Sequence, residues 1–280
     1  MSYKTILASL NEISQLDCIL RAATSIAKTE GAHIVGLYVI PGIELKLASE
    51  IETLPIEDDT LQKHYTQQEK SVRSTFEEAV KEAGVQGEFQ VLVAPWPHIS
   101  RTVVEEARQA DLVIVGCSSS ESNRALGTGF SEEVLFGSGR PTLVMPPTGH
   151  SGFPIDRIMI GWNGSREATR AIFDAIPLLK QADDVLIAAE ESDTALGETR
   201  MDARKNALIR TLLRQGIKAR IIGLDGSHDV GEALLTKAES RRADLLVMGA
   251  YGHARLREFL LGGATRSVLK GMKCGVLFSH

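Results

Sequence analysis

Cysteine is scarce in this 280-residue chain, and no part of it is apolar for long. The three cysteines, Cys18, Cys117 and Cys274, lie far apart without paired spacing, which argues against a zinc site or a redox dithiol. No apolar run approaches the roughly 18–20 residues that a membrane-spanning helix needs. The first residues also lack the apolar core of a signal peptide. We therefore expect a cytoplasmic protein without a membrane partner.

Motifs of dedicated catalysis are missing as well. The chain has no Gly-Lys dipeptide and so no Walker-type loop, and it has neither a Gly-x-Ser-x-Gly elbow nor a His-Glu-x-x-His helix. Residues 127–132 begin like Gly-x-Gly-x-x-Gly, but Glu132 stands where the last glycine belongs. A net charge of −5 gives no broad basic surface for nucleic acid. We expect neither a dedicated enzyme nor a nucleic-acid partner.

The chain does contain an internal repeat. Residues 111–116 recur as 244–249, an offset of 133 residues that persists without a gap to the matching segments 141–144 and 274–277. Upstream, 4–7 matches 157–160, so the first copy carries about twenty extra residues. We place them in the acidic stretch 41–59, which we interpret as an irregular loop rather than a docking surface.

The repeat and a Pro/Gly/Ser-rich segment between its copies predict two domains, 1–147 and 155–280, with a linker at 148–154. In each copy, short apolar runs alternate with segments of helical periodicity, which indicates parallel strands joined by crossover helices. The first copy predicts strands at 5–9, 33–40, 88–93, 112–116 and 142–145, and the second predicts one helical stripe over 168–179. The fold class is therefore α/β, with two tandem doubly wound, five-stranded, Rossmann-like sheets. Such sheets bind ligands past the carboxyl ends of their strands, where the strand order reverses.

The second copy has the spacing of a phosphate site after its fourth strand. Gly249, Gly252 and Gly262 punctuate the loop, and Gly263-Ala264-Thr265 opens a short helix. Glycines allow the backbone to approach phosphate oxygens closely. The helix start adds unpaired N–H groups and the positive end of the helix dipole. This loop predicts binding of a di- or triphosphate.

With the five-strand repeat, this loop resembles the nucleotide-binding branch of the universal stress protein family, in its tandem two-domain form. The resemblance covers essentially the whole chain. It implies that the loop flanks the ribose and phosphates, that the helix start holds phosphate oxygens, and that a polar residue after the first strand contacts the ribose or base. The predicted nucleotide-binding residues are Trp162, Asn163, Met248, Gly249, Gly252, His253, Gly262, Gly263, Ala264 and Thr265.

The chain departs from the family pattern at two of these positions. Asn163 stands where the family more often has Asp, and Gly263 stands where it usually has Ser or Thr. We expect these changes to weaken affinity rather than abolish it. In the first copy the equivalents of Asn163, Gly252 and Gly263 are Leu10, Ser119 and Phe130. The first domain is therefore predicted to be a structural partner that binds no nucleotide.

Several residues keep two interpretations. Trp162 either stacks on a base or packs in the core, and His253 either contacts a phosphate or lies on an exposed loop. Cys117 is either a reactive thiol or a buried, inert one. The arginines around the loop either neutralise phosphate charge or form a solvated basic face; they are Arg255, Arg257 and Arg266.

The function that the sequence favours is binding of ATP or a related adenine nucleotide in the second domain, in a stress-response or regulatory role. Whether Mg²⁺ accompanies the nucleotide is open. A nucleotide-free interaction scaffold and a slow ATPase are the alternatives. The resemblance also implies pairing of the two domains through their last strands, 142–145 and 275–278, and a further homodimer stays open.

Overall fold

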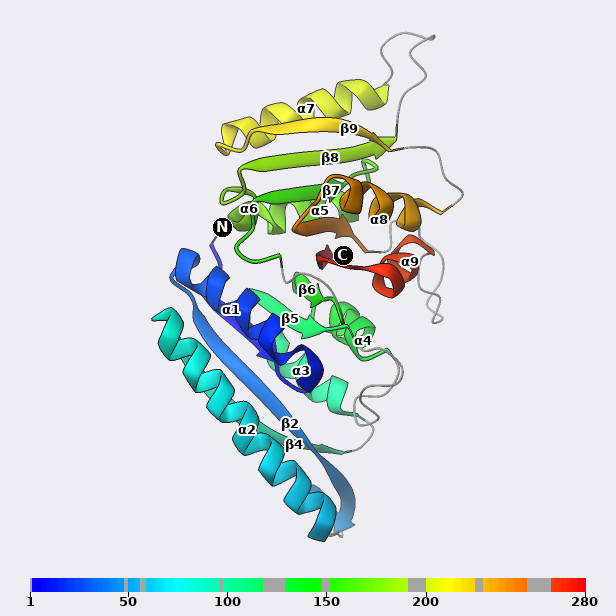
Figure 1. The fold of residues 1–280 in the computed structure, drawn as a ribbon. Coiled ribbons are helices and arrows are strands. Elements are labelled where there is room, and N and C mark those ends of the chain that lie inside the picture. The colour runs from blue at the N-terminus through cyan, green and yellow to red at the C-terminus, as the bar shows by residue number, and fades with distance from the viewer. Residues whose placement is uncertain are drawn as a thin grey trace. The chain divides into compact units, whose positions relative to one another are not determined.

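The computed structural model describes residues 2–47, 50–55, 59–95, 98–117, 129–147, 152–190, 200–224, 229–250 and 263–280. These residues form two compact units, 2–147 and 148–280, here called the N-terminal and C-terminal domains (Figure 1). Each is an α/β unit built on a mostly parallel sheet, which confirms the predicted fold class.

The sheet of the N-terminal domain has the order β4-β2-β1-β5-β6, and all four of its pairings are parallel. A further strand, β3, pairs antiparallel with the outer part of β2. In chain order its elements are β1 (Thr5–Ser9), the 3-10 turn η1 (Ile13–Gln15), α1 (Leu16–Glu30), β2 (His33–Leu47), β3 (Glu50–Pro55), α2 (Asp59–Ala83), β4 (Gln86–Pro95), α3 (Ile99–Ala107), β5 (Leu112–Gly116), α4 (Phe130–Gly137) and β6 (Thr142–Met145).

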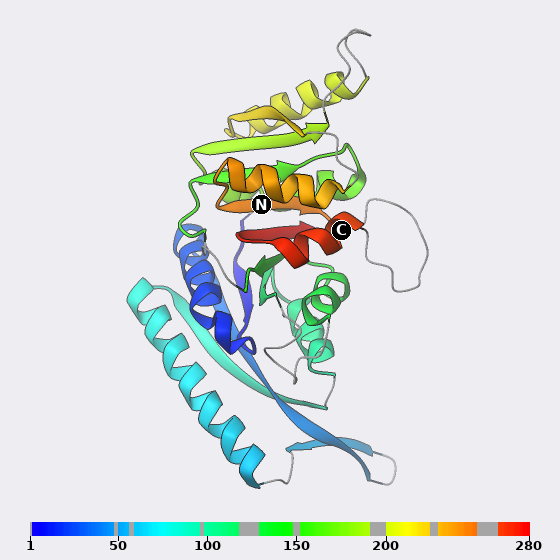
Figure 2. The same cartoon turned by 45° about the vertical axis from the view of Figure 1, so that its right-hand side comes forward.

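The stretch 41–59 is not the irregular loop that the sequence predicted. Strand β2 continues through Leu47, and β3 returns beside it from Glu50 to Pro55. Figure 2 shows this hairpin extending beyond the carboxyl ends of the other strands. Apolar and charged residues alternate from Ile43 to Leu47, which is the period of a strand. The acidic composition concealed that alternation.

The C-terminal domain has the strand order β9-β8-β7-β10-β11, and every pairing is parallel. Its elements are β7 (Arg157–Gly161), α5 (Arg166–Asp174), α6 (Ile176–Leu179), β8 (Asp184–Glu190), α7 (Arg200–Arg214), β9 (Ala219–Leu224), α8 (Val230–Ser240), β10 (Leu245–Gly249), α9 (Gly263–Gly271) and β11 (Gly275–Ser279). Helices α8 and α9 lie side by side on one face of the sheet, and α5 packs on β10 and β11 from the other.

The single helical stripe predicted over 168–179 is two helices. Helix α5 ends at Asp174 and α6 starts at Ile176, with Pro177 in its first turn. Proline has no N–H to donate and its ring clashes with the carbonyl four residues earlier, so α5 cannot continue through it. The apolar spacing continues from α5 into α6 because both helices face the core.

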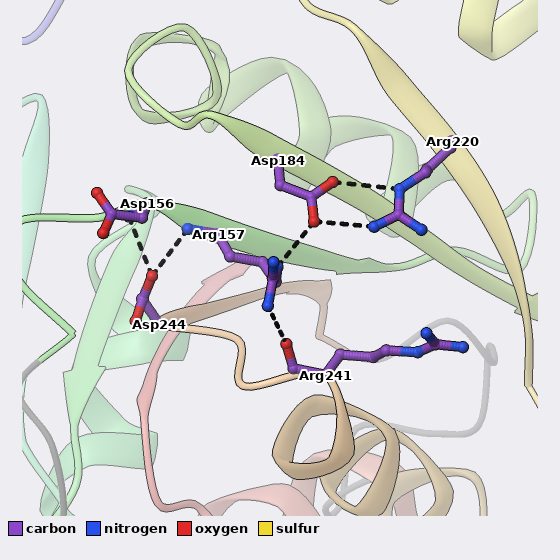
Figure 3. Close-up of polar contacts among 6 residues, drawn as sticks. All are labelled: Asp156, Arg157, Asp184, Arg220, Arg241 and Asp244. Atoms are coloured by element: carbon purple, nitrogen blue, oxygen red, sulfur yellow. Dashed lines mark hydrogen bonds and ion pairs between the residues drawn. The ribbon is translucent and has the colours of Figure 1, made fainter.

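The amino ends of both sheets share one polar contact. In the N-terminal domain, Asp111 Oδ2 accepts hydrogen bonds from the backbone N–H groups of Lys4 and Thr5, at 2.7 and 3.0 Å. In the C-terminal domain, Asp244 Oδ2 accepts from those of Asp156 and Arg157, at 3.0 and 2.8 Å (Figure 3). The offset between these aspartates is that of the repeat. These contacts at the amino ends of the strands therefore have a structural role.

An ion-pair group lies at the same edge of the C-terminal domain. Asp184 pairs with Arg220 at 2.9 Å and with Arg157 at 2.7 Å, and Arg157 also donates to the carbonyl of Arg241 (Figure 3). The hydrogen bond from Arg220 is the main cause that lowers the pKa of Asp184. These side chains are partly exposed, and such pairs contribute little to stability.

Candidate nucleotide-binding site

The strand order of the C-terminal domain reverses between β7 and β10. The chain builds outward from β7 to β8 and β9, then returns past β7 to β10 and β11. A doubly wound sheet opens a crevice past the carboxyl ends of its strands at such a point. Met248 pairs with Gly161 in the register, which brings Trp162 and Gly249 to the same edge. Four of the predicted residues, Trp162, Asn163, Met248 and Gly249, therefore come together.

Helix α9 starts with the three residues that the sequence predicted, Gly263, Ala264 and Thr265. Gly263 is exposed, whereas Thr265 is only 2% exposed. The accessible part of this helix start is therefore backbone, and the Thr265 hydroxyl points away from solvent. The predicted residues Gly252, His253 and Gly262, together with Arg255 and Arg257, lie outside the described residues.

Helix α9 is fixed in place by α8, a contact that the sequence analysis missed. Asp229 caps α8 by accepting from the N–H groups of Gly231 and Glu232, at 2.7 and 3.2 Å. Its other oxygen accepts a hydrogen bond from the Ser267 hydroxyl of α9, which is the main cause that lowers the pKa of Asp229. An Asp followed three residues later by Glu is a helix-start signal in the sequence. That signal predicts the cap but not the hydrogen bond from Ser267.

Gly249 has a packing role that its spacing did not reveal. A Cβ atom at this position would lie 2.4 Å from the backbone nitrogen of Ala168 and 2.5 Å from the carbonyl carbon of Glu167. The first turn of α5 thus rests directly on the end of β10. Gly249 is required there whether or not a phosphate binds.

The turn after β7 presents Asn163 at the edge of the crevice. Asn163 is exposed, and its Oδ1 accepts from the N–H of Ser165 at 3.0 Å. Gly164 occupies the left-handed region with φ of 75°, and Ser165 caps α5 by accepting from the N–H of Ala168. Because Oδ1 is engaged by the backbone, the Nδ2 group is the part of Asn163 available to a ligand, and it is a donor.

Trp162 is 8% exposed, and among the described residues its Nε1 has no hydrogen-bond partner. Gly161, the residue before it, faces Leu234 of α8. Side chains alternate along a strand, so the Trp162 indole points to the opposite face, where α5 packs. This burial favours the packing interpretation over stacking on a base.

The equivalent crevice of the N-terminal domain is filled by side chains. Leu10, the counterpart of Asn163, is 0% exposed. Asn11 holds both backbone groups of Val39, at 2.7 and 3.0 Å, and Gln15 holds both backbone groups of Cys117, at 2.7 and 3.0 Å. Phe130, the counterpart of Gly263, is buried in the core, and Ser119 lies outside the described residues. The backbone after β5 is thus held by Gln15, the last residue of η1.

Two buried acidic groups of the N-terminal crevice have pKa values that their surroundings raise. Burial raises the pKa of Glu12 to about 7, and its Oε1 has no hydrogen-bond partner in the part of the chain that the structure describes. Burial also raises the pKa of the Cys117 thiol to about 11. A thiol so protonated is a poor nucleophile, which favours the inert interpretation of Cys117.

Neither a metal site nor a membrane span appears in the part of the chain that the structure describes. Its His, Cys, Asp and Glu residues form no group of three or more suited to hold a metal ion. None of its helices combines the length and apolar character required to cross a bilayer.

The protein is thus of the tandem type with two doubly wound α/β domains, one with its crevice filled by side chains and the other with its crevice framed by glycines. The sequence profile of the Universal stress protein family matches residues 2–146 and 154–280. The chain belongs to the universal stress protein family.

The chain is also similar to several known proteins. The chain is 34% identical over 86 residues to Universal stress protein Slr1230 of Synechocystis, a match that spans 29% of each protein. A universal stress protein of Archaeoglobus fulgidus superposes with a TM-score of 0.73 at 20% identity, covering 98% of this chain and 95% of the other. The functionally unknown protein PA1789 of Pseudomonas aeruginosa gives 0.64 at 15% identity, covering 99% and 92%. At these identities the structural likeness establishes the fold.

Proposed function

We propose that the C-terminal domain binds ATP or a related adenine nucleotide, and that the protein acts in a stress response or in regulation through this binding. The observation that carries the proposal is the difference between the two crevices. Where Asn11 and Gln15 seal the N-terminal crevice, the C-terminal domain has Gly164 and Ala168. Among the described residues, no side chain of α5 holds Ala250 in the way that Gln15 holds Cys117, its counterpart in the repeat.

The groups that border the C-terminal crevice suit a phosphorylated ligand. The Asn163 amide can donate to a ribose hydroxyl, and the exposed start of α9 offers backbone N–H groups. A helix of nine residues, Gly263–Gly271, adds the positive end of its dipole, which stabilises an anion. Arg266 on α9 is exposed and would add positive charge. Magnesium would enter with the phosphates.

A charge placed at the helix start tests the proposal. The space beyond the Gly263 Cα is free, with nothing within 4 Å of an added Cβ, so a side chain fits there without a clash. Gly263→Asp places a carboxylate against the phosphates, and Gly263→Asn is its neutral, isosteric control. In calorimetric titrations of nucleotide-stripped protein, we expect wild type to bind one equivalent of ATP. The Asp variant should bind it about tenfold or more weakly, and the Asn variant much less so.

Three outcomes would change the proposal. Two equivalents of ATP would show that the N-terminal crevice also binds. Equal losses in the Asp and Asn variants would show that the helix start does not face phosphate. No binding to stripped wild type would leave the nucleotide-free scaffold as the function.

We further infer that the nucleotide is a signal rather than a substrate. The chain lacks a Walker-type lysine and the other motifs of phosphoryl transfer. Phosphate release measured with saturating ATP and Mg²⁺ should stay at the rate of the Gly263→Asp variant. Release that is faster in wild type would favour the slow ATPase.

A further inference from the structure

Helix α7 places two side chains against the turn that borders the crevice. A Cβ atom added to Gly164 would lie 3.6 Å from Cε and 3.7 Å from Sδ of Met201, and 3.8 Å from a terminal guanidinium nitrogen of Arg204. These residues are three positions apart on α7, so they lie on one face of the helix. Both therefore reach the turn that presents Asn163. They are about forty residues from that turn in the sequence, which gave no sign of the contact.

The position of α7 is fixed by its neighbour Lys205. Lys205 is 5% exposed, and its Nζ donates to the carbonyl of Glu190 at the end of β8, at 2.6 Å. A buried ammonium bound to a strand end holds the first turns of the helix to the carboxyl edge of the sheet. Arg204 is exposed beside it and has no ion pair among the described residues. A fixed helix with an uncommitted guanidinium at the crevice edge is suited to contact a ligand.

The strand order decides which end of a nucleotide Arg204 can meet. Strands β8 and β10 flank β7 on opposite sides, so α7 lies on the β8 side and the start of α9 on the β10 side. A nucleotide whose phosphates rest on α9 spans β7 and points its base toward α7. Building on the proposed nucleotide function, we propose that Met201 and Arg204 contact the nucleobase. The methionine supplies apolar, polarizable surface and the guanidinium stacks on the planar ring.

A phosphate-only probe separates base contact from phosphate contact. ATP, ADP, AMP and inorganic tripolyphosphate would be titrated into wild type, Arg204→Ala and Arg204→Lys. We expect Arg204→Ala to weaken all three nucleotides by the same factor, about fivefold to thirtyfold, and to leave tripolyphosphate unchanged. Arg204→Lys should stay weakened, because an ammonium keeps the charge without the planar surface. Met201→Ala should weaken the same nucleotides by about threefold.

Arg214→Ala is the matched control. Arg214 is the last residue of the same helix, ten residues or about 15 Å from Arg204, and is also exposed. It should bind as wild type does. A loss in Arg204→Ala that grows from AMP to ATP, full rescue by Lys, or unchanged binding would each overturn the base contact while the nucleotide function stands. Absence of any binding by wild type would overturn both.

Discussion

The two domains share a backbone plan but differ in the residues that come after their first strand. In the N-terminal domain, Asn11 and Gln15 form four hydrogen bonds to the backbone and close the crevice. In the C-terminal domain, Gly164 lies in the turn and Ala168 lies in the first turn of α5, and neither has a side chain long enough to do the same. The difference teaches that side chains, rather than the backbone fold, distinguish the filled crevice from its counterpart.

The buried polar atoms that lack a partner show where each domain departs from full hydrogen bonding. Among the described residues they are Ser9 Oγ, Glu12 Oε1, Trp162 Nε1 and Ser279 Oγ. All four lie at or just after the carboxyl end of a strand. Unpaired buried polar groups cost free energy and tend to gather at functional sites. In both domains, hydrogen bonding is thus less complete at the carboxyl ends of the strands than at the amino ends, where Asp111 and Asp244 are paired with backbone N–H groups.

The largest effect is expected from a methyl group at the end of the fourth strand. Gly249→Ala would press on the backbone of α5, which cannot move aside, and should destabilise the C-terminal domain by about 3 kcal/mol. Gly116→Ala in the N-terminal domain meets side-chain rather than backbone atoms, those of Gln15 and Glu12 at 2.8 Å, which are longer contacts than the 2.4 Å at Gly249. It should cost about half as much. Denaturant unfolding of both variants measures the two costs.

Nucleotide titration compares ATP binding by the same two variants. ATP binding should be lost in Gly249→Ala and retained in Gly116→Ala. Equal losses of stability would show that α5 yields as readily as a side chain. Equal losses of binding would show that the N-terminal crevice takes part in it.

A second effect comes from the buried carboxyl of the N-terminal crevice. The pKa of Glu12 is raised to about 7 by burial, from an ordinary value of 4.5, so the folded state holds its proton more tightly than the unfolded state. Between these two pH values unfolding releases that proton, and stability falls as the pH rises. The loss should be on the order of 2 kcal/mol by pH 8, allowing for solvent screening.

Glu12→Gln should remove this component of the pH dependence and make the protein more stable than wild type at pH 8. Denaturant unfolding at pH 5 and pH 8 measures both proteins. The C-terminal domain has Ser165 at the matching position and should contribute no such component. Parallel pH profiles for Glu12→Gln and wild type would contradict the role of this carboxyl.

The smallest effect is expected where the N-terminal crevice is sealed. Gln15→Ala removes both bonds to Cys117, although the Cys117 N–H keeps its bond to Met145 O at 2.9 Å. The cost should be about 1.5 kcal/mol, with faster hydrogen exchange at the end of β5. Gln109→Ala, at an exposed glutamine, is the control and should be near neutral. If Gln15→Ala gained a second ATP site, that side chain would be the sole barrier to binding.

The sequence predicted some strands to the residue, and the reason is local. The apolar runs 5–9, 112–116 and 142–145 coincide with β1, β5 and β6, because these short strands are buried along almost their whole length and read as uninterrupted apolar segments. Strands β2 and β4 are longer than predicted: β2 runs to Leu47 and β4 covers Gln86–Pro95. Their outer parts carry polar residues that pair through the backbone, which composition does not reveal.

The sequence by itself determined the repeat, the α/β class, the family resemblance and the glycine-framed helix start, because each depends on spacing along the chain. Only the tertiary structure decided the burial of Trp162, the packing role of Gly249 and the approach of Arg204 to the turn at Gly164. Each of these depends on which face of a strand or helix meets another element. Contacts between segments about forty or more residues apart arise from the packing of α5 and α7 on the sheet, and no local pattern in the sequence encodes them.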